Sequence, residues 1–191
     1  GYERYFAQGG DWGAAITTAI GVRQSESGGG CAGIHVNMPL AGPDPATMDD
    51  LTDAERDALA ATKFYQQWDS GYSKQQSTRP QTIGYSLVDS PAGLAGWILE
   101  KFHRWMDCDG HPENVATRDE LLDNLMFYWL TKSGASSARL YWESFNNPDM
   151  SEVELSTAIS LFPNEIFRSS ERWARKKFRN FFRCVTIIQL N

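Results

Sequence analysis

Hydrophobic and polar residues follow two different periods along this chain, and the change of period separates expected strands from expected helices. Short apolar runs at residues 3–10 and 31–38 predict two strands, and the small residues between them, 12–24, predict a helix. From residue 50 to residue 145 the apolar side chains recur at helical spacing instead. Two strands joined by one helix form a βαβ unit, so the first part of the chain predicts a parallel sheet.

The middle of the chain is expected to hold a set of helices that interrupts this sheet. Helices are predicted to begin near residues 50, 90, 117 and 136, and Gly71-Tyr72-Ser73 is expected to end the first of them. A helical block of roughly 100 residues is much longer than an ordinary crossover between neighbouring parallel strands. We therefore expect an inserted cap over the carboxyl edge of the sheet.

A second β-rich segment follows the helical block. Residues 153–162 predict a strand, and Glu165 comes just after it, at the end of the strand where open α/β sheets carry their chemistry. A helix at 170–182 and a final strand at 185–188 complete the pattern. The expected organisation is an α/β core at 1–43, a helical cap at 44–148 and the continued core at 149–191.

The stretch from Gln8 to Ala15 carries the most specific chemical signal. It reads Gln-Gly-Gly-Asp-Trp-Gly-Ala-Ala between a predicted strand and a predicted helix, with glycines two residues before and two residues after Asp11. A nucleophile elbow has this pattern, because the central residue is strained and the strand and helix pass too closely for side chains at the flanking positions. A carboxylate at the centre would attack a strained or activated carbon and form an ester. The alternative is a glycine-rich turn with a solvated aspartate.

Composition narrows the class of partner. The net charge of −6 argues against nucleic acid or an anionic membrane, and no apolar run reaches the roughly 20 residues of a membrane span. Cys31, Cys108 and Cys184 are far apart and lack metal-ligand spacing, which is typical of reduced thiols in a cytoplasmic protein. We expect no cofactor and no metal. The opening residues contain neither an initiator methionine nor a signal peptide, which suggests a fragment.

Basic residues crowd the last predicted helix and the residues after it. Such a stripe is compatible with nucleic-acid binding, but in an acidic chain a solvated helix face is the favoured interpretation. The residues are Arg172, Arg175, Lys176, Lys177, Arg179 and Arg183.

Several motifs occur in the order and spacing of one enzyme family. They are Gly9-Gly10-Asp11-Trp12-Gly13, Gly71-Tyr72, Gln76 to Gly84, Asp89-Ser90-Pro91-Ala92-Gly93-Leu94, Tyr128-Trp129-Leu130-Thr131 and Phe162-Pro163-Asn164-Glu165. Together they resemble the microsomal-type epoxide hydrolases, which include juvenile-hormone epoxide hydrolases and soluble bacterial and fungal members. The resemblance runs from the first residue to about Phe178. It implies part of an α/β-hydrolase fold with a helical cap.

The resemblance also implies a role for each matched residue. Asp11 would be the nucleophile that attacks an epoxide carbon, and Tyr72 and Tyr141 would donate hydrogen bonds to the epoxide oxygen. Glu165 would orient the catalytic histidine, and the main-chain N–H of Trp12 would belong to the oxyanion hole, with its ring lining the pocket. The implied substrate is a small hydrophobic epoxide. For the complete protein, detoxification or aromatic hydrocarbon catabolism and a homodimeric state are open options.

Two departures from the family pattern affect activity. The family's Gly-Gly-His-Phe segment, which carries the catalytic histidine, has no counterpart after Phe178, and the His-Gly-x-Pro oxyanion loop and first strands are missing upstream. His35, His103 and His111 are expected to be ordinary structural or surface residues. A sheet without its first half is expected to leave one edge and one apolar face uncovered.

Three functions therefore remain open. The first is an epoxide hydrolase that is catalytically incomplete in these 191 residues. The second is a haloalkane dehalogenase-like hydrolase, in which Asp-Trp also occurs at an elbow. The third is a non-catalytic truncated relative that binds hydrophobic ligands through its aromatic cap.

Overall fold

The chain forms two compact units. The computed structural model describes residues 2–145, 149 and 151–186. One unit contains Gly1–Gln67 and Asp149–Asn191, and the other is Trp68–Pro148. Residues 44–67 thus belong to the same unit as the sheet, although the sequence analysis assigned them to the cap. No described helix is long and apolar enough to cross a membrane.

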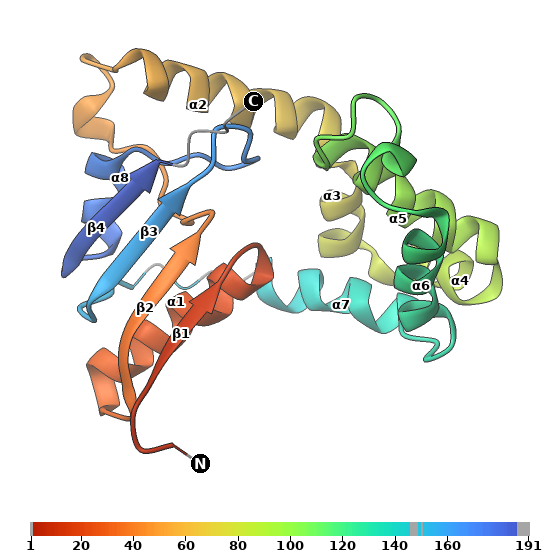
Figure 1. Ribbon diagram of the computed structural model, residues 1–191, viewed down its shortest axis with the longest axis horizontal. Helices are drawn as coiled ribbons and strands as arrows, with labels where there is room; N and C mark the ends of the chain where they lie inside the picture. Colours follow the sequence, from red (N-terminus) through yellow and green to blue (C-terminus); the bar gives the residue numbers. More distant parts are fainter. Residues whose placement is uncertain (1, 146–148, 150, 187–191) are drawn as a thin grey trace. The chain divides into compact units, whose positions relative to one another are not determined.

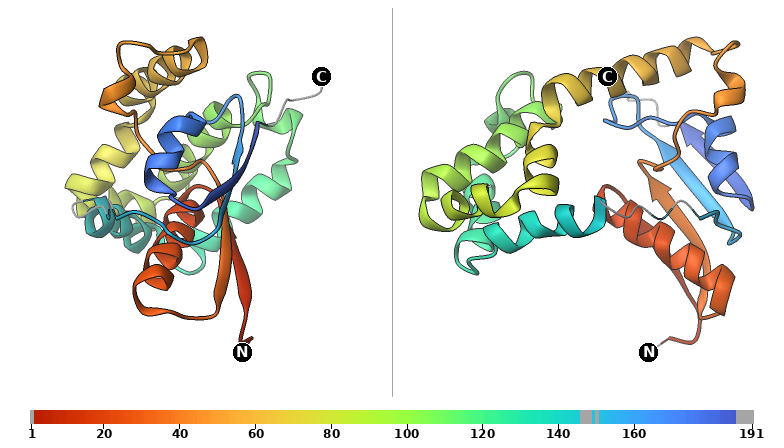
Figure 2. Two further views of the ribbon diagram at one scale, coloured as in Figure 1. Left: turned by 90° about the vertical axis from the view of Figure 1, so that its left-hand side faces the viewer. Right: turned by 180° about the vertical axis from the view of Figure 1, so that it is seen from behind.

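The first unit is built on a parallel sheet of four strands in the order β1-β2-β3-β4 (Figure 1). The strands are β1 (Tyr5–Gly9), β2 (Cys31–Asn37), β3 (Thr157–Leu161) and β4 (Phe181–Thr186). Helices α1 (Trp12–Ser27) and α8 (Glu171–Lys177) lie on the same face of this sheet (Figure 2). The parallel sheet and the βαβ start predicted from the sequence are confirmed.

The core of this unit lies between the sheet and these two helices. Ile34 and Val36 alternate with half-buried residues along β2, and their side chains point to the side of α1. A Cβ on Gly21 of α1 would lie 3.0 Å from the side chain of Ile34, so the helix approaches the strand closely. Figure 1 views the other face, over which no described helix of this unit lies, and Phe6 is 74% exposed. Polar residues such as Gln8 and His35 share this face, so the face expected to be uncovered and apolar is only partly apolar.

Helix α2 (Asp53–Phe64) also belongs to the first unit and is followed by a π-helical turn, η2 (Tyr65–Asp69). Thr52 begins α2 through a capping box: its hydroxyl accepts from the Glu55 N–H, and the Glu55 carboxylate accepts from the Thr52 N–H. A short 3₁₀ turn, η1 (Pro45–Thr47), precedes it.

The second unit is a helical bundle with a small core of its own. Helix α7 packs against α3 and α4, and α5 packs against α4 and α6. A Cβ on Gly134 would lie 2.8 Å from the Leu87 Cβ, so α4 and α7 approach closely because of this glycine. Its elements are α3 (Gly71–Thr78), α4 (Pro80–Asp89), α5 (Pro91–Trp105), η3 (Pro112–Asn114), α6 (Arg118–Trp129) and α7 (Gly134–Phe145).

Several predicted boundaries were wrong. Gly71 begins α3 and does not simply interrupt a helix, and α4 was not predicted at all. The helix expected at 170–182 ends at Lys177, because Phe178 is fully buried and the chain turns there to start β4. Of the expected strand 185–188, residues 187 and 188 lie outside the described residues.

Candidate active site

Asp11 occupies the sharp turn between β1 and α1. Its backbone has φ 50° and ψ −127°, a positive-φ conformation that non-glycine residues rarely adopt. The N–H of Trp12 donates to Asp11 Oδ1 at 2.5 Å, and the N–H of Ala14 donates to the Asp11 carbonyl at 3.0 Å. The turn therefore presents an exposed carboxylate, one oxygen of which accepts from the N–H that the family resemblance implies for the oxyanion hole.

The glycines before Asp11 are required by space. A Cβ on Gly9 would lie 2.1 Å from the carbonyl oxygen of Gly13, and a Cβ on Gly10 would lie 2.3 Å from the Asn37 side-chain nitrogen. Gly13 differs: apart from its chain neighbours and the adjoining backbone of α1, no heavy atom of the described residues lies within 4 Å of the position of its Cβ. The expectation of crowding on both sides of the elbow thus holds for Gly9 and is wrong for Gly13.

Glu165 lies in the loop that follows β3, and Asp11 follows β1, so both carboxylates lie beyond the carboxyl ends of parallel strands. The Glu165 side chain is half-buried, and its Oε1 accepts from the Ile166 N–H at 3.0 Å. Burial raises the pKa of Glu165 above its ordinary value, and the negative charge of Asp11 raises it further. The two carboxylates are therefore close enough for their charges to interact.

The two cap tyrosines come from different helices of the second unit and meet. Tyr72 lies in the first turn of α3 and Tyr141 in α7, and their ring centroids are 5.7 Å apart with an interplanar angle of 79°. Trp105 packs edge-on against Tyr72 at 5.3 Å. The Lys101 Nζ lies 5.0 Å from the centroid of the Tyr72 ring. Residues separated by almost 70 positions in the sequence thus form one aromatic cluster.

The three histidines lie in three different parts of the structure. His35 lies in β2, level with Gln8 of β1, and its Nε2 is 2.9 Å from the Ser160 hydroxyl. The Nδ1 of His111 accepts from the Glu113 N–H, which starts the η3 turn. His103 is exposed in the last turn of α5. None of the three follows the last described strand, where the resemblance places the catalytic histidine.

The basic helix α8 is not simply a solvated face. Arg172 donates to both carboxylate oxygens of Glu55, at 2.7 and 2.5 Å, and also to Asp50. Lys176 forms an ion pair with Asp44 at 2.5 Å. These bonds attach α8 to the start of α2 and to the segment before it. The sequence showed the basic run but not its acidic partners, because they lie more than 100 residues upstream.

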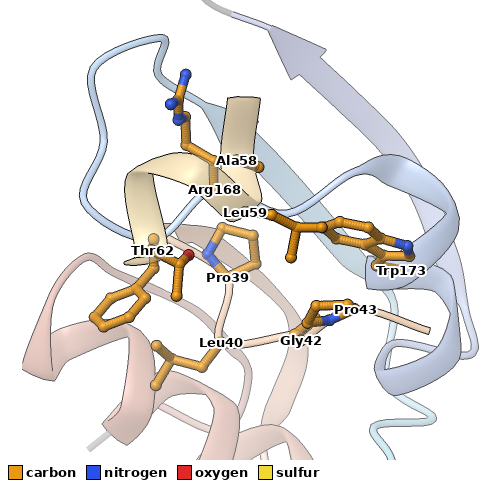
Figure 3. Close-up of a pocket in the computed structure, with 11 residues that line it drawn as sticks. Pro39, Leu40, Gly42, Pro43, Ala58, Leu59, Thr62, Arg168 and Trp173 are labelled. Carbon is orange, nitrogen blue, oxygen red and sulfur yellow. The ribbon is translucent and has the colours of Figure 1, made fainter. Parts of the chain in front are cut away.

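A pocket of about 300 Å³ lies in the first unit, between α2, the segment after β2 and α8 (Figure 3). Its walls are mainly apolar, including Pro39, Leu59 and Trp173, and Trp173 is 2% exposed. Asp11, Trp12 and Glu165 do not line this pocket. It was not predicted from the sequence, since its walls come from three distant segments.

Proteins similar in sequence to this chain are described as epoxide hydrolases. A putative epoxide hydrolase of Stigmatella aurantiaca is 47% identical over 179 residues, which cover 93% of this chain and 40% of that protein. Epoxide hydrolase 1 of Oryctolagus cuniculus is 33% identical over 205 residues, covering 93% of this chain and 44% of that protein. The chain therefore spans less than half the length of these curated relatives.

Among solved structures, the juvenile hormone epoxide hydrolase of the silkworm Bombyx mori superposes with a TM-score of 0.84 at 31% identity. The superposition covers 98% of this chain and 50% of that one. No model of a protein family matches the sequence.

Proposed function

This chain belongs, over the segment compared, to the epoxide hydrolases of the α/β-hydrolase fold, and on that basis we propose that its residues attack epoxides through Asp11. The single observation that carries the proposal is the backbone of Asp11, held at φ 50° between a strand and a helix. Strain of this kind is maintained at functional sites, where it exposes a reactive side chain.

In the proposed first step the free carboxylate oxygen of Asp11 attacks an epoxide carbon. A new C–O ester bond forms, and the strained C–O bond of the epoxide breaks with its electron pair on the departing oxygen. The Trp12 N–H donates to Oδ1 and so restrains the carboxylate, and Oδ2 would be the oxygen that attacks the epoxide. This arrangement needs no separate base, since an ionised carboxylate is already a nucleophile.

The departing oxygen would take a proton from one of the paired phenols. An alkoxide is a poor leaving group, and a phenol with a pKa of about 10 donates readily to it. Tyr72 and Tyr141, in contact through their rings, supply two such hydroxyls from one cluster. Two donors would share the developing negative charge.

In the second proposed step, water attacks the ester carbonyl, the acyl C–O bond breaks, and a diol and the Asp11 carboxylate result. A histidine oriented by Glu165 would take the proton from this water and return it to the tyrosine that was deprotonated in the first step. The alkyl oxygen released from the ester takes the proton of the newly formed Asp11 carboxyl group, which restores the carboxylate. These 191 residues hold no segment matching the family's histidine motif, so by themselves they are expected to form the ester but not to hydrolyse it. Action on small hydrophobic epoxides, a cytoplasmic location and a homodimer remain predictions for the complete protein.

A hybrid enzyme provides the test. In it, this chain replaces the matched segment of the Stigmatella aurantiaca relative, which supplies the rest of that protein. With styrene oxide the hybrid should release diol, and mass spectrometry after rapid quenching should find an ester on the peptide that contains Asp11. Asp11→Asn should abolish both signals.

Three outcomes would count against the proposal. Diol release that survives Asp11→Asn would mean that another group attacks the epoxide. Halide release from 1-chlorobutane without any diol from styrene oxide would favour the dehalogenase alternative. Folded hybrid that binds styrene oxide without any adduct would favour a non-catalytic relative.

A further inference from the structure

The loop that carries Glu165 is fastened by an arginine three residues further on. The Arg168 Nη1 donates to the Pro163 carbonyl at 3.0 Å, so its side chain spans the loop and bonds to the residue two before Glu165. Its Nη2 donates to the Asp57 carbonyl on α2, also at 3.0 Å. A single planar guanidinium thus joins both ends of the loop segment to a neighbouring helix.

Phe167, the residue before Arg168, makes a second contact near the end of α2. The ring of Phe167 packs against Tyr65 with centroids 4.9 Å apart, and Tyr65 is almost completely buried at the end of α2. Figure 3 shows the stem of Arg168 bordering the pocket and its guanidinium directed away from the pocket. The guanidinium therefore binds the loop and α2 and does not enter the pocket.

Arg168 also has an unfavourable feature. Its Nε is buried and has no hydrogen-bond partner among the described residues. Leaving a buried donor unpaired costs about 1–3 kcal/mol, and more for a charged group. If Arg168 served only to stabilise the fold, its buried Nε would be expected to have a hydrogen-bond partner. The two bonds that Arg168 does make, to the carbonyls of Pro163 and Asp57, therefore indicate that the position of the loop is what matters.

We propose that Arg168 is a positioning residue for Glu165, which holds the carboxylate at the place where it must orient the catalytic histidine. The inference rests on the proposed function. Arg168 fixes the main chain on both sides of Glu165, at Pro163 and at its own position, and α2 provides the rigid support. Only the step that uses the histidine, hydrolysis of the ester, depends on this geometry.

The experiment separates the two half-reactions in the hybrid enzyme with styrene oxide. Single-turnover rapid quenching gives the rate of ester formation and the rate of ester hydrolysis. Arg168→Met keeps the aliphatic stem and removes the two bonds. We expect ester hydrolysis to slow by about 10- to 100-fold, because misplacement of a catalytic group by about 1 Å has effects of this size, while ester formation changes less than about twofold.

Two control variants test the geometry. Arg56→Met removes an exposed arginine of α2 whose partner is Asp53, and it should change neither rate. Asp57→Ala leaves the carbonyl that Arg168 binds, so it too should have no effect if the bond is to the main chain. If Arg168→Met does not fold, Arg168→Lys is measured instead, and it should show an intermediate loss because a single ammonium reaches one carbonyl.

The outcomes also separate this inference from the proposed function. A lower melting temperature with both rates unchanged would make Arg168 merely structural and overturn the inference. An equal loss in both half-reactions would overturn it as well, because Glu165 acts only in the second. If unmodified hybrid forms no ester at Asp11, the proposed function itself fails, whatever Arg168→Met does.

Discussion

Asp11 keeps an unfavourable backbone conformation because its neighbours leave no alternative. A non-glycine residue in such a region costs about 1–3 kcal/mol. Gly9 and Gly10 allow α1 and Asn37 to approach the turn, and the Gln8 side chain donates to Asn37 at 2.9 Å, which joins the ends of β1 and β2. The strain at one residue is thus maintained by contacts of the residues around it.

A matched pair of glycine substitutions tests this account. Gly9→Ala should destabilise the fold by about 3 kcal/mol or more, because the new methyl group would meet main-chain atoms of Gly13 at 2.1 Å, and backbone cannot move aside as a side chain can. Gly13→Ala should be neutral or stabilise by up to about 1 kcal/mol, because the methyl group meets open space and alanine favours the helix. Urea unfolding measures both. Equal destabilisation by the two substitutions would contradict the crowding argument.

At the residue scale, local signals made part of the candidate site predictable. Asp11 could be proposed from the sequence because its motif is contiguous and needs glycines at defined spacing. Glu165 followed from its place after a strand, whereas Tyr72 and Tyr141 were recognised only through the family resemblance. Arg168 could not be found, because its partners are main-chain carbonyls, and any residue type provides those.

At the scale of elements, the attachment of α8 to α2 depends on a buried charge. Glu55 is 1% exposed and caps the start of α2, and Arg172 of α8 binds both of its carboxylate oxygens. The hydrogen bonds from Arg172 hold the pKa of Glu55 far below its usual range, more strongly than burial raises it. Because the folded-state pKa is lowered, this carboxylate stabilises the fold fully at pH values above its ordinary pKa of about 4.5, and the contribution is lost progressively as the pH falls below that value.

Substitution of this glutamate should therefore cost most at pH values where Glu55 is ionised in the unfolded chain as well as in the fold. We expect Glu55→Gln to lower the free energy of unfolding by about 2–3 kcal/mol at pH 7, since it leaves the Arg172 charge without its partner. The difference from unmodified chain should shrink below about pH 4, where Glu55 begins to be protonated in the unfolded state. Urea unfolding at several pH values measures it.

The i,i+4 pair of Glu171 and Arg175 on the same helix α8 provides the control. Both side chains are about half exposed, so Glu171→Gln should cost less than about 0.5 kcal/mol. A cost of Glu55→Gln that stays constant between pH 7 and pH 3 would argue against an electrostatic origin.

The elements themselves were predictable where start signals are local. The capping box at Thr117 and the Ser90-Pro91 pair begin α6 and α5 as expected. Helix α4 was missed although Pro80 at its start is a local signal, because neither α3 nor α4, which meet at Arg79, begins with a side-chain cap. The length of α8 was overestimated because its end is set by burial of Phe178 against the sheet, which is a tertiary effect.

At the scale of the whole molecule, the proposed chemistry needs carboxylates from one unit and phenols from the other. In the hybrid enzyme, Tyr72→Phe and Tyr141→Phe should each slow ester formation by about tenfold, and the double variant by about 100-fold or more, because the departing oxygen loses its donors. Rapid-quench measurement of the ester from styrene oxide gives these rates. Tyr85→Phe is the control, since Tyr85 belongs to the same unit but is 67% exposed on α4. Full activity of the double variant would remove the tyrosines from the mechanism.

The packing of α3 against α7 also bears on how this protein is made. β2 and β3 are neighbours in the sheet, yet roughly 120 residues separate them, so a ribosome must synthesise the whole insertion before these strands can pair. A flexible loop of that length would impose a substantial entropic penalty on pairing. Because α3 opens the inserted unit and α7 closes it, their contact brings its two ends together. A helical insertion that folds first would thus shorten the effective loop and speed assembly of the sheet that follows it.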